Sequence, residues 1–206
     1  MSASCGHDGL ETIKYRNVLW TVFAINAGMF AIEIVAGALA SSVSLQADAL
    51  DFFADAANYL VALFVLERSI QWRAGAALAK GAAMGVFGLY VLGFSAYQLF
   101  SGEVPSAPVM GAVGALALIA NVVSAVLLFR HREGDSNRQS VWLCSRNDAI
   151  ANVAVIIAAG LVYLTATHWP DLIVGFFMAG LALHSAWQII RQAVGELRDG
   201  VPTPAE

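Results

Sequence analysis

Ionisable side chains lie inside two segments of this chain that are otherwise apolar and long enough to cross a bilayer. Residues 45–65 contain Asp48, Asp51 and Asp55. A second apolar segment begins near Asp148. An ionised side chain in the hydrocarbon core costs roughly 2.5–3.5 kcal/mol even on lenient insertion scales. Because this cost opposes insertion, we predict that these carboxylates serve a function.

The composition is that of a membrane protein. Of the 206 residues, 59% are hydrophobic and only 13% are charged, and the mean hydropathy is +0.69. The apolar residues form long runs rather than a stripe that repeats every 3.6 residues, which is typical of spanning segments. The two cysteines, Cys5 and Cys144, are far apart in the chain, and Cys5 lies in a polar tail. A disulfide framework is therefore not predicted.

The predicted fold class is all-α, a polytopic membrane protein with six transmembrane helices. About 20 apolar residues cross a hydrocarbon core of about 30 Å. Six segments meet this length, residues 18–39, 44–65, 78–99, 109–129, 137–164 and 172–191. The transmembrane domain is thus expected at residues 18–191. The flanking tails, residues 1–17 and 192–206, are each too short to form a core of their own.

The basic residues predict the topology. All 11 Lys and Arg residues lie before the first helix, after the second, fourth or sixth helix, or in the first turns of the fifth. The connections after the first, third and fifth helices contain none. Cytoplasmic loops of membrane proteins are enriched in Lys and Arg. Both termini are therefore predicted to be cytoplasmic, in a multi-pass protein of the cell (inner) membrane. Arg146 is expected to reach back to the cytoplasmic headgroups.

Two pairs of candidate metal ligands have the spacing of one helical turn. Asp51 and Asp55 share one helix face, and Cys144 and Asp148 share another. Three carboxylates and a thiolate form a ligand set for a divalent cation. Four such ligands suit tetrahedral coordination, which favours zinc over magnesium. The thiolate softens the site and should also admit cadmium.

These candidate ligands also have structural interpretations. Asp51 and Asp55 could share a proton and cap a neighbouring helix. Cys144 alone could be a small buried hydrophobic residue. Asp48 lies on the same helix face as Asp51 and Asp55. It could be a ligand, cap the helix or act as a gate on the release path.

Other polar residues are candidates for supporting or gating roles. Asn26 and Glu33 share a face of the first helix and are expected to form hydrogen bonds with another helix. Asn152, one turn beyond Asp148, could orient that carboxylate. Gly81 and Gly85 offer a smooth face for close helix packing, either within one monomer or at a dimer seam. A homodimer formed through the transmembrane helices is expected on this basis.

Several motifs resemble those of the cation diffusion facilitators, a family of divalent metal efflux transporters. The motifs are Glu33-Ile-Val-Ala-Gly37, SLQADALDFFAD at residues 44–55, NDAIANVAV at residues 147–155 and WPDLIVG at residues 169–175. The resemblance covers nearly the whole chain, although nothing specific to the family stands in the third and fourth helices. It is closest to the subset of the family that lacks a cytoplasmic C-terminal domain.

The resemblance implies a transporter that exchanges a divalent cation for protons by alternating access, and not an enzyme. By residue match, Asp51, Asp55, Cys144 and Asp148 would form the transport site, although the family more often has His where Cys144 stands. Zinc and cadmium are the expected cargo, with manganese, iron and cobalt as alternatives. No resident cofactor is expected. The expected partners are divalent metal ions, protons and the lipid bilayer, with no nucleic acid.

Other functional classes fit the sequence less well. An intramembrane aspartyl protease would need a Gly-x-Gly-Asp motif, which is absent. A passive cation channel would need a ring of charges from several subunits rather than two close pairs on one chain. A structural or small multidrug-type membrane protein would need only one carboxylate. The empty metal site would concentrate negative charge in a low dielectric, so at least one group should hold a proton that the metal displaces.

Overall fold

The computed structural model contains six helices and no strand in the residues that it describes. It describes the backbone of residues 5–64, 69–129 and 136–199, and the side chains of residues 15–64, 69, 71–72, 74–129 and 148–198. The helices are α1 (Cys5–Leu39), α2 (Val43–Phe64), α3 (Ile70–Ser101), α4 (Ala107–Phe129), α5 (Ser136–Thr165) and α6 (Trp169–Asp199). The all-α class and the order of six helices are thus confirmed.

Three helices extend beyond the apolar segments that predicted them. Helix α1 begins at Cys5 rather than near residue 18, α3 begins at Ile70 rather than near residue 78, and α6 ends at Asp199 rather than near residue 191. Polar residues such as Glu, Lys, Arg and Gln are good helix formers. Hydropathy therefore marks where a membrane span ends but not where its helix ends.

Five helices contain a stretch that is long and apolar enough to cross a membrane, so the chain is a multi-pass membrane protein. These stretches are Tyr15–Leu39, Ala74–Ser101, Ala107–Phe129, Asp148–Thr165 and Trp169–Arg198. Helix α2, which carries three aspartates within eight residues, is not among them. It lies instead against all five other helices.

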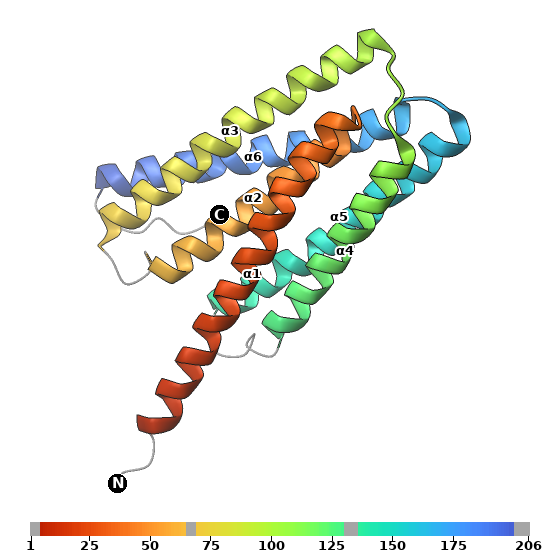
Figure 1. Ribbon diagram of the computed structural model, residues 1–206. Coiled ribbons are helices and arrows are strands. Elements are labelled where there is room, and N and C mark those ends of the chain that lie inside the picture. Colours follow the sequence, from red (N-terminus) through yellow and green to blue (C-terminus); the bar gives the residue numbers. More distant parts are fainter. Residues whose placement is uncertain (1–4, 65–68, 130–135, 200–206) are drawn as a thin grey trace.

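The helices form two parts that meet at α2 (Figure 1). Helices α1, α2, α4 and α5 form a bundle, in which α1 packs on α2 and α4 packs on α5. Helices α3 and α6 form a long pair that packs against α2. Gly81 allows α3 to approach α6 closely, because a Cβ atom there would lie 2.8 Å from Cγ1 of Ile190. A Cβ at Gly85 would meet no atom of another helix within 4 Å among the described residues.

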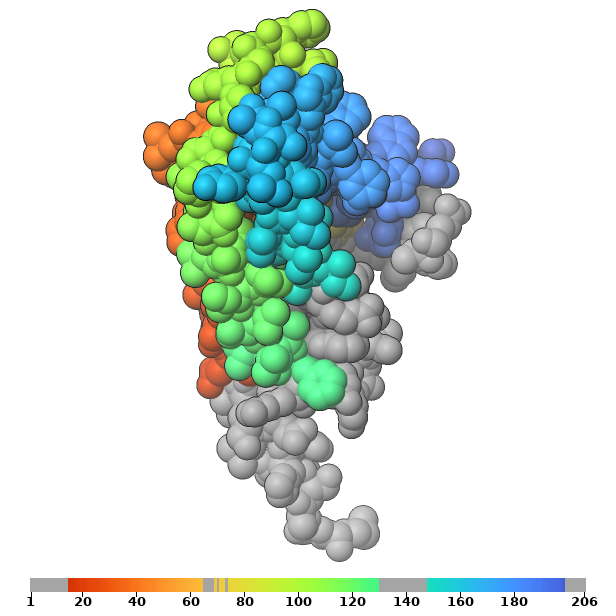
Figure 2. Space-filling model, turned by 90° about the vertical axis from the view of Figure 1, so that its right-hand side faces the viewer, coloured from red at the N-terminus to blue at the C-terminus, as the bar shows by residue number. Residues whose placement is uncertain are grey.

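The α1–α2, α3–α4 and α5–α6 connections meet at one end of the molecule, which we call the hairpin end. There the amide of Ser106 donates a hydrogen bond to the carbonyl of Ala40 (3.0 Å), and the hydroxyl of Ser41 donates one to Glu103 (3.0 Å). The segments that contain the α3–α4 and α5–α6 connections lie next to each other in the upper part of Figure 2. We call the opposite end, from which α1 starts and at which α6 finishes, the terminal end.

Helices α5 and α6 are joined at the hairpin end and diverge toward the terminal end (Figure 1). A hydrophobic core fills the hairpin-end half between α2, α5 and α6 and includes Leu50, Val155 and Met178. A second cluster packs α1 and α4 against α2 through Met29, Phe52 and Ala117. The divergence of α5 and α6 positions the site described next.

Candidate functional site

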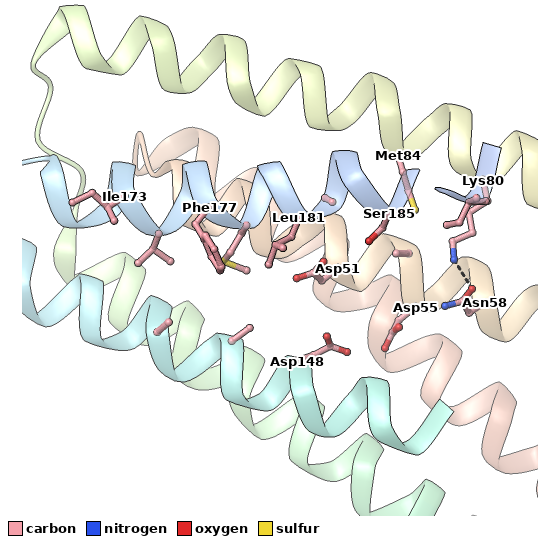
Figure 3. A pocket seen from close by; sticks show the side chains of 17 residues that line it. Asp51, Asp55, Asn58, Lys80, Met84, Asp148, Ile173, Phe177, Leu181 and Ser185 are labelled. Carbon is pink, nitrogen blue, oxygen red and sulfur yellow. Dashed lines mark hydrogen bonds between the residues drawn. The ribbon is translucent and has the colours of Figure 1, made fainter. Parts of the chain in front are cut away.

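Three of the predicted ligands line one cavity of about 700 Å³ between α2, α3, α5 and α6. Asp51 and Asp55 enter it from α2, and Asp148 enters it from the facing side of α5 (Figure 3). The one-turn spacing of Asp51 and Asp55 places both on the same face of α2, as the sequence predicts. The rest of the wall is mainly apolar and comes largely from α6. The cavity thus brings carboxylates from two distant segments into one space.

Hydrogen bonds orient the polar groups at the terminal side of the cavity. The hydroxyl of Tyr59 donates a hydrogen bond to Oδ2 of Asp55 (3.2 Å), and both side chains are buried. Tyr59 lies one turn after Asp55, so the bond also restrains the carboxylate within α2. On α3, the ammonium of Lys80 donates a hydrogen bond to Oδ1 of Asn58 (Figure 3). A positive charge therefore stands in the wall beside the three carboxylates.

The three aspartates share the cavity but do not form a complete metal centre. Among the described side chains, no group of three or more His, Cys, Asp or Glu residues could hold a metal ion. The backbone of Cys144 belongs to α5, one turn before Asp148. Its side chain lies outside the described residues. Of the four ligands predicted from the sequence, Asp51, Asp55 and Asp148 therefore line the cavity, and the side chain of Cys144 is not described.

The supporting residues lie away from the cavity lining, in the interior of the helix bundle. Glu33 is 0% exposed and Asp48 is 1% exposed, and none of their carboxylate oxygens has a hydrogen bond of ordinary geometry to another described residue. Asn26 donates a hydrogen bond to the carbonyl of Val22 (2.7 Å) in its own helix rather than to another helix. Asn152 is fully buried, and neither of its amide atoms has a hydrogen-bond partner among the side chains and backbone that the structure describes.

Asp171 has a structural role that the sequence analysis missed. It was noted only as part of a motif, but its carboxylate accepts four hydrogen bonds from the start of α2. The donors are the hydroxyl of Ser42 (2.8 Å), the amide of Val43 (2.7 Å), and the amide (3.0 Å) and hydroxyl (2.5 Å) of Ser44. The sequence offers one signal for this role, because Asp171 is an acidic residue in a predicted connection that contains no Lys or Arg.

Comparison with known proteins gives a family match over most of the chain. Residues 19–198 match the model of the cation efflux transmembrane domain. The zinc transporter ZitB of Escherichia coli (strain K12) is 28% identical over 206 residues, covering 93% of this chain and 65% of that protein. The cadmium, cobalt and zinc/H(+)-K(+) antiporter of Bacillus subtilis (strain 168) is 24% identical over 96% of this chain and 68% of that protein.

A mammalian relative also matches nearly the whole of this chain but only part of its own length. The proton-coupled zinc antiporter SLC30A2 of Mus musculus is 25% identical over 97% of this chain and 61% of that protein. The chain therefore spans about two thirds of the length of these curated relatives, between 61% and 68%. The metals and protons in these names describe the transport activity of those relatives.

Proposed function

Because the chain belongs to the cation efflux family, whose members are transporters and not enzymes, we propose that it exchanges a divalent cation for protons across the membrane. The transport site would consist of Asp51, Asp55, Cys144 and Asp148. The observation that carries this proposal is the shared cavity, in which carboxylates from α2 and α5 face one another between membrane-spanning helices (Figure 3). Carboxylates with separate structural roles would have no need of a common cavity.

Zinc and cadmium are the proposed cargo. The named relatives transport zinc, and one also transports cadmium and cobalt. A site of three carboxylates alone would favour harder cations such as manganese, whereas a thiolate favours zinc and cadmium. Cys144, one turn from Asp148, would supply that thiolate. Manganese, iron and cobalt remain the alternative cargo if Cys144 is not a ligand.

Proton coupling follows from the charge of the ligands. Carboxylates and thiols bind metal in their deprotonated forms, so metal binding releases protons from the site. When the metal has left, four negative charges in a low-dielectric cavity repel one another, which favours the return of protons. If the cavity is exposed alternately to the two sides, an inward proton gradient drives the cation outward.

We further propose that α2 also spans the membrane and that the terminal end is cytoplasmic. Lys80 and Arg191 lie toward the terminal end, and no Lys or Arg residue lies in the three connections of the hairpin end. Tags at each chain end should then resist impermeant reagents in sealed cells. Labelling of either tag in intact cells would contradict this topology.

The test of transport uses proteoliposomes with an imposed pH gradient and a panel of metals. We expect wild-type protein to accumulate zinc and cadmium with opposite proton movement, and the Asp148→Asn variant to behave like protein-free liposomes. Glu196→Gln, which removes a carboxylate at the terminal end of α6, is the matched control and should transport normally. Normal transport by Asp148→Asn would refute the site, and proton-independent uptake would refute the antiport.

A further inference from the structure

We propose that the hydrogen bonds between Asp171 and the start of α2 are the gate that closes the hairpin end of the transport cavity. We call this group, made of Asp171, Ser42, Ser44 and the amide of Val43, the Asp171 clasp. The proposal rests on the proposed transport function. It assigns to Asp171 a gating role in the transport cycle, separate from the binding of the cation.

The clasp joins the two parts of the molecule. Helix α6 belongs to the α3–α6 pair, and α2 belongs to the other bundle. The cavity runs along α6 from Ile189 to Ile173, so its hairpin-end wall stops two residues from Asp171. On α2 the cavity lining ends at Asp51, so the buried residues from Val43 to Leu50 and their seam with α6 lie between Asp51 and the hairpin end. The clasp occupies that seam.

The seam is closed by backbone contact as well as by the carboxylate. Gly175 lies one turn after Asp171 on α6. A Cβ atom at Gly175 would lie 2.5 Å from Cγ1 of Val43 and 2.8 Å from the amide nitrogen of Ser44. The backbones of α6 and α2 therefore touch directly, and no side chain fits between them. Asp171 itself is only 1% exposed.

Helix α2 has a local cap at its amino-terminal end in addition to its hydrogen bonds to Asp171. The hydroxyl of Ser42 accepts a hydrogen bond from the amide of Leu45 (3.2 Å), which is the ordinary arrangement of an N-cap residue. This local cap can persist when α6 moves away. Asp171 adds a second set of bonds that belongs to the contact between helices. Ser42 thus accepts from the amide of Leu45, whereas Asp171 accepts from the amides of Val43 and Ser44 across the contact between the helices.

The chemistry of the clasp suits a contact that opens and closes. Hydrogen bonds to an ionised carboxylate are stronger than bonds between neutral groups. All of the clasp's donors and acceptors can bond to water instead when the seam opens, so neither state leaves a polar group without a partner. Because the four bonds share one carboxylate, they should break together. These properties give two discrete states, closed and open.

The decisive experiment locks the clasp with a reversible disulfide. Ser44→Cys and Asp171→Cys would be combined in a Cys5→Ser background, and zinc transport would be measured in proteoliposomes after oxidation and again after reduction. We expect oxidation to reduce transport to the level of protein-free liposomes and reduction to restore it. Zinc binding from the terminal end should survive oxidation.

A second cysteine pair provides the matched control. Gly88→Cys and Leu183→Cys would link α3 to α6 within one part of the molecule, where the side chain of Leu183 lies against Gly88. Oxidation of this pair should leave transport unchanged. It also reports any effect of the oxidant on Cys144. Undiminished transport by the fully oxidised Ser44→Cys/Asp171→Cys protein would overturn the gate, whereas failure of wild type to transport would overturn the proposed function.

A variant without added cross-links gives an independent measurement. Asp171→Asn removes the charge while keeping the side-chain shape, so the closed state should be less populated. A cysteine placed at Ser44 should then react faster with an impermeant maleimide than it does when Asp171 is present. Thermal unfolding in detergent shows whether the variant is folded. Equal labelling rates in two folded proteins would contradict the proposal.

Discussion

The two halves of α2 place the same type of side chain in opposite surroundings. From Val43 to Leu50 every residue is buried, and none lines the cavity. This half contains Asp48, which is sealed between helices near Glu33. In the following half, Asp51 and Asp55 reach the cavity although they lie on the same face of the helix as Asp48. Access to the cavity, and not residue type, therefore separates the candidate ligands from the buried acid.

The largest expected effect tests this separation directly. Asp51→Asn should lower zinc affinity by more than about 100-fold, which exceeds the loss typical of a residue that only supports a ligand. Asp48→Asn should lower it by less, within about tenfold, because Asp48 does not line the cavity. Calorimetry on detergent-solubilised protein measures both. An equal loss of zinc affinity in the two variants would show that access to the cavity does not distinguish Asp51 from Asp48.

The next largest effect is expected for substitutions in α5, the helix that faces Asp51 and Asp55 across the cavity. Cys144→Ala should weaken zinc and cadmium binding by about 100-fold and lower the preference for cadmium, because a soft thiolate ligand is lost. Cys144→His should retain zinc transport while losing relative preference for cadmium. If the Ala variant keeps the wild-type ratio of cadmium to zinc affinity, Cys144 is not a ligand.

Two glycine substitutions in α6 test the contact with the buried half of α2, from Val43 to Leu50. Gly175→Ala should destabilise the protein by about 1–3 kcal/mol, because the added methyl group overlaps the first turn of α2. Gly180→Ala, five residues later, meets no atom of another helix within 4 Å in the described part of the chain and should be neutral or slightly stabilising. Thermal unfolding in detergent compares them. A loss of stability in both would mean that contact with α2 is not the cause.

The smallest expected effect concerns the orientation of Asp55. Tyr59→Phe removes the hydroxyl that donates to Oδ2 of Asp55 and should lower zinc affinity by about tenfold at most. A larger loss, equal to that of Asp51→Asn, would give Tyr59 a more direct role than orientation. Unchanged affinity would show that packing alone positions Asp55 in the cavity half of α2.

Local sequence patterns predicted the helices better than they predicted the polar contacts. The one-turn spacing of Asp51 and Asp55 correctly placed both on one face, because helix geometry relates residues that are close in the chain. The same reasoning treated Asp48 as a possible ligand, because it shares that face. It expected Asn26 to reach another helix, whereas its hydrogen bond remains within α1. Asp171 was not linked to Ser42, because 129 residues separate them.

By itself, the sequence determined that this chain forms apolar helices in a fixed order, with Asp51 and Asp55 one turn apart on the second and Cys144 and Asp148 one turn apart on the fifth. Run length and helical periodicity are local properties, so they can be read without knowing how the helices pack. Only the tertiary structure decided which carboxylates share a cavity and which are sealed. It also decided that α6 caps α2 from a distance. These outcomes depend on which faces of α2 its five neighbours cover, and contacts between distant segments set that arrangement.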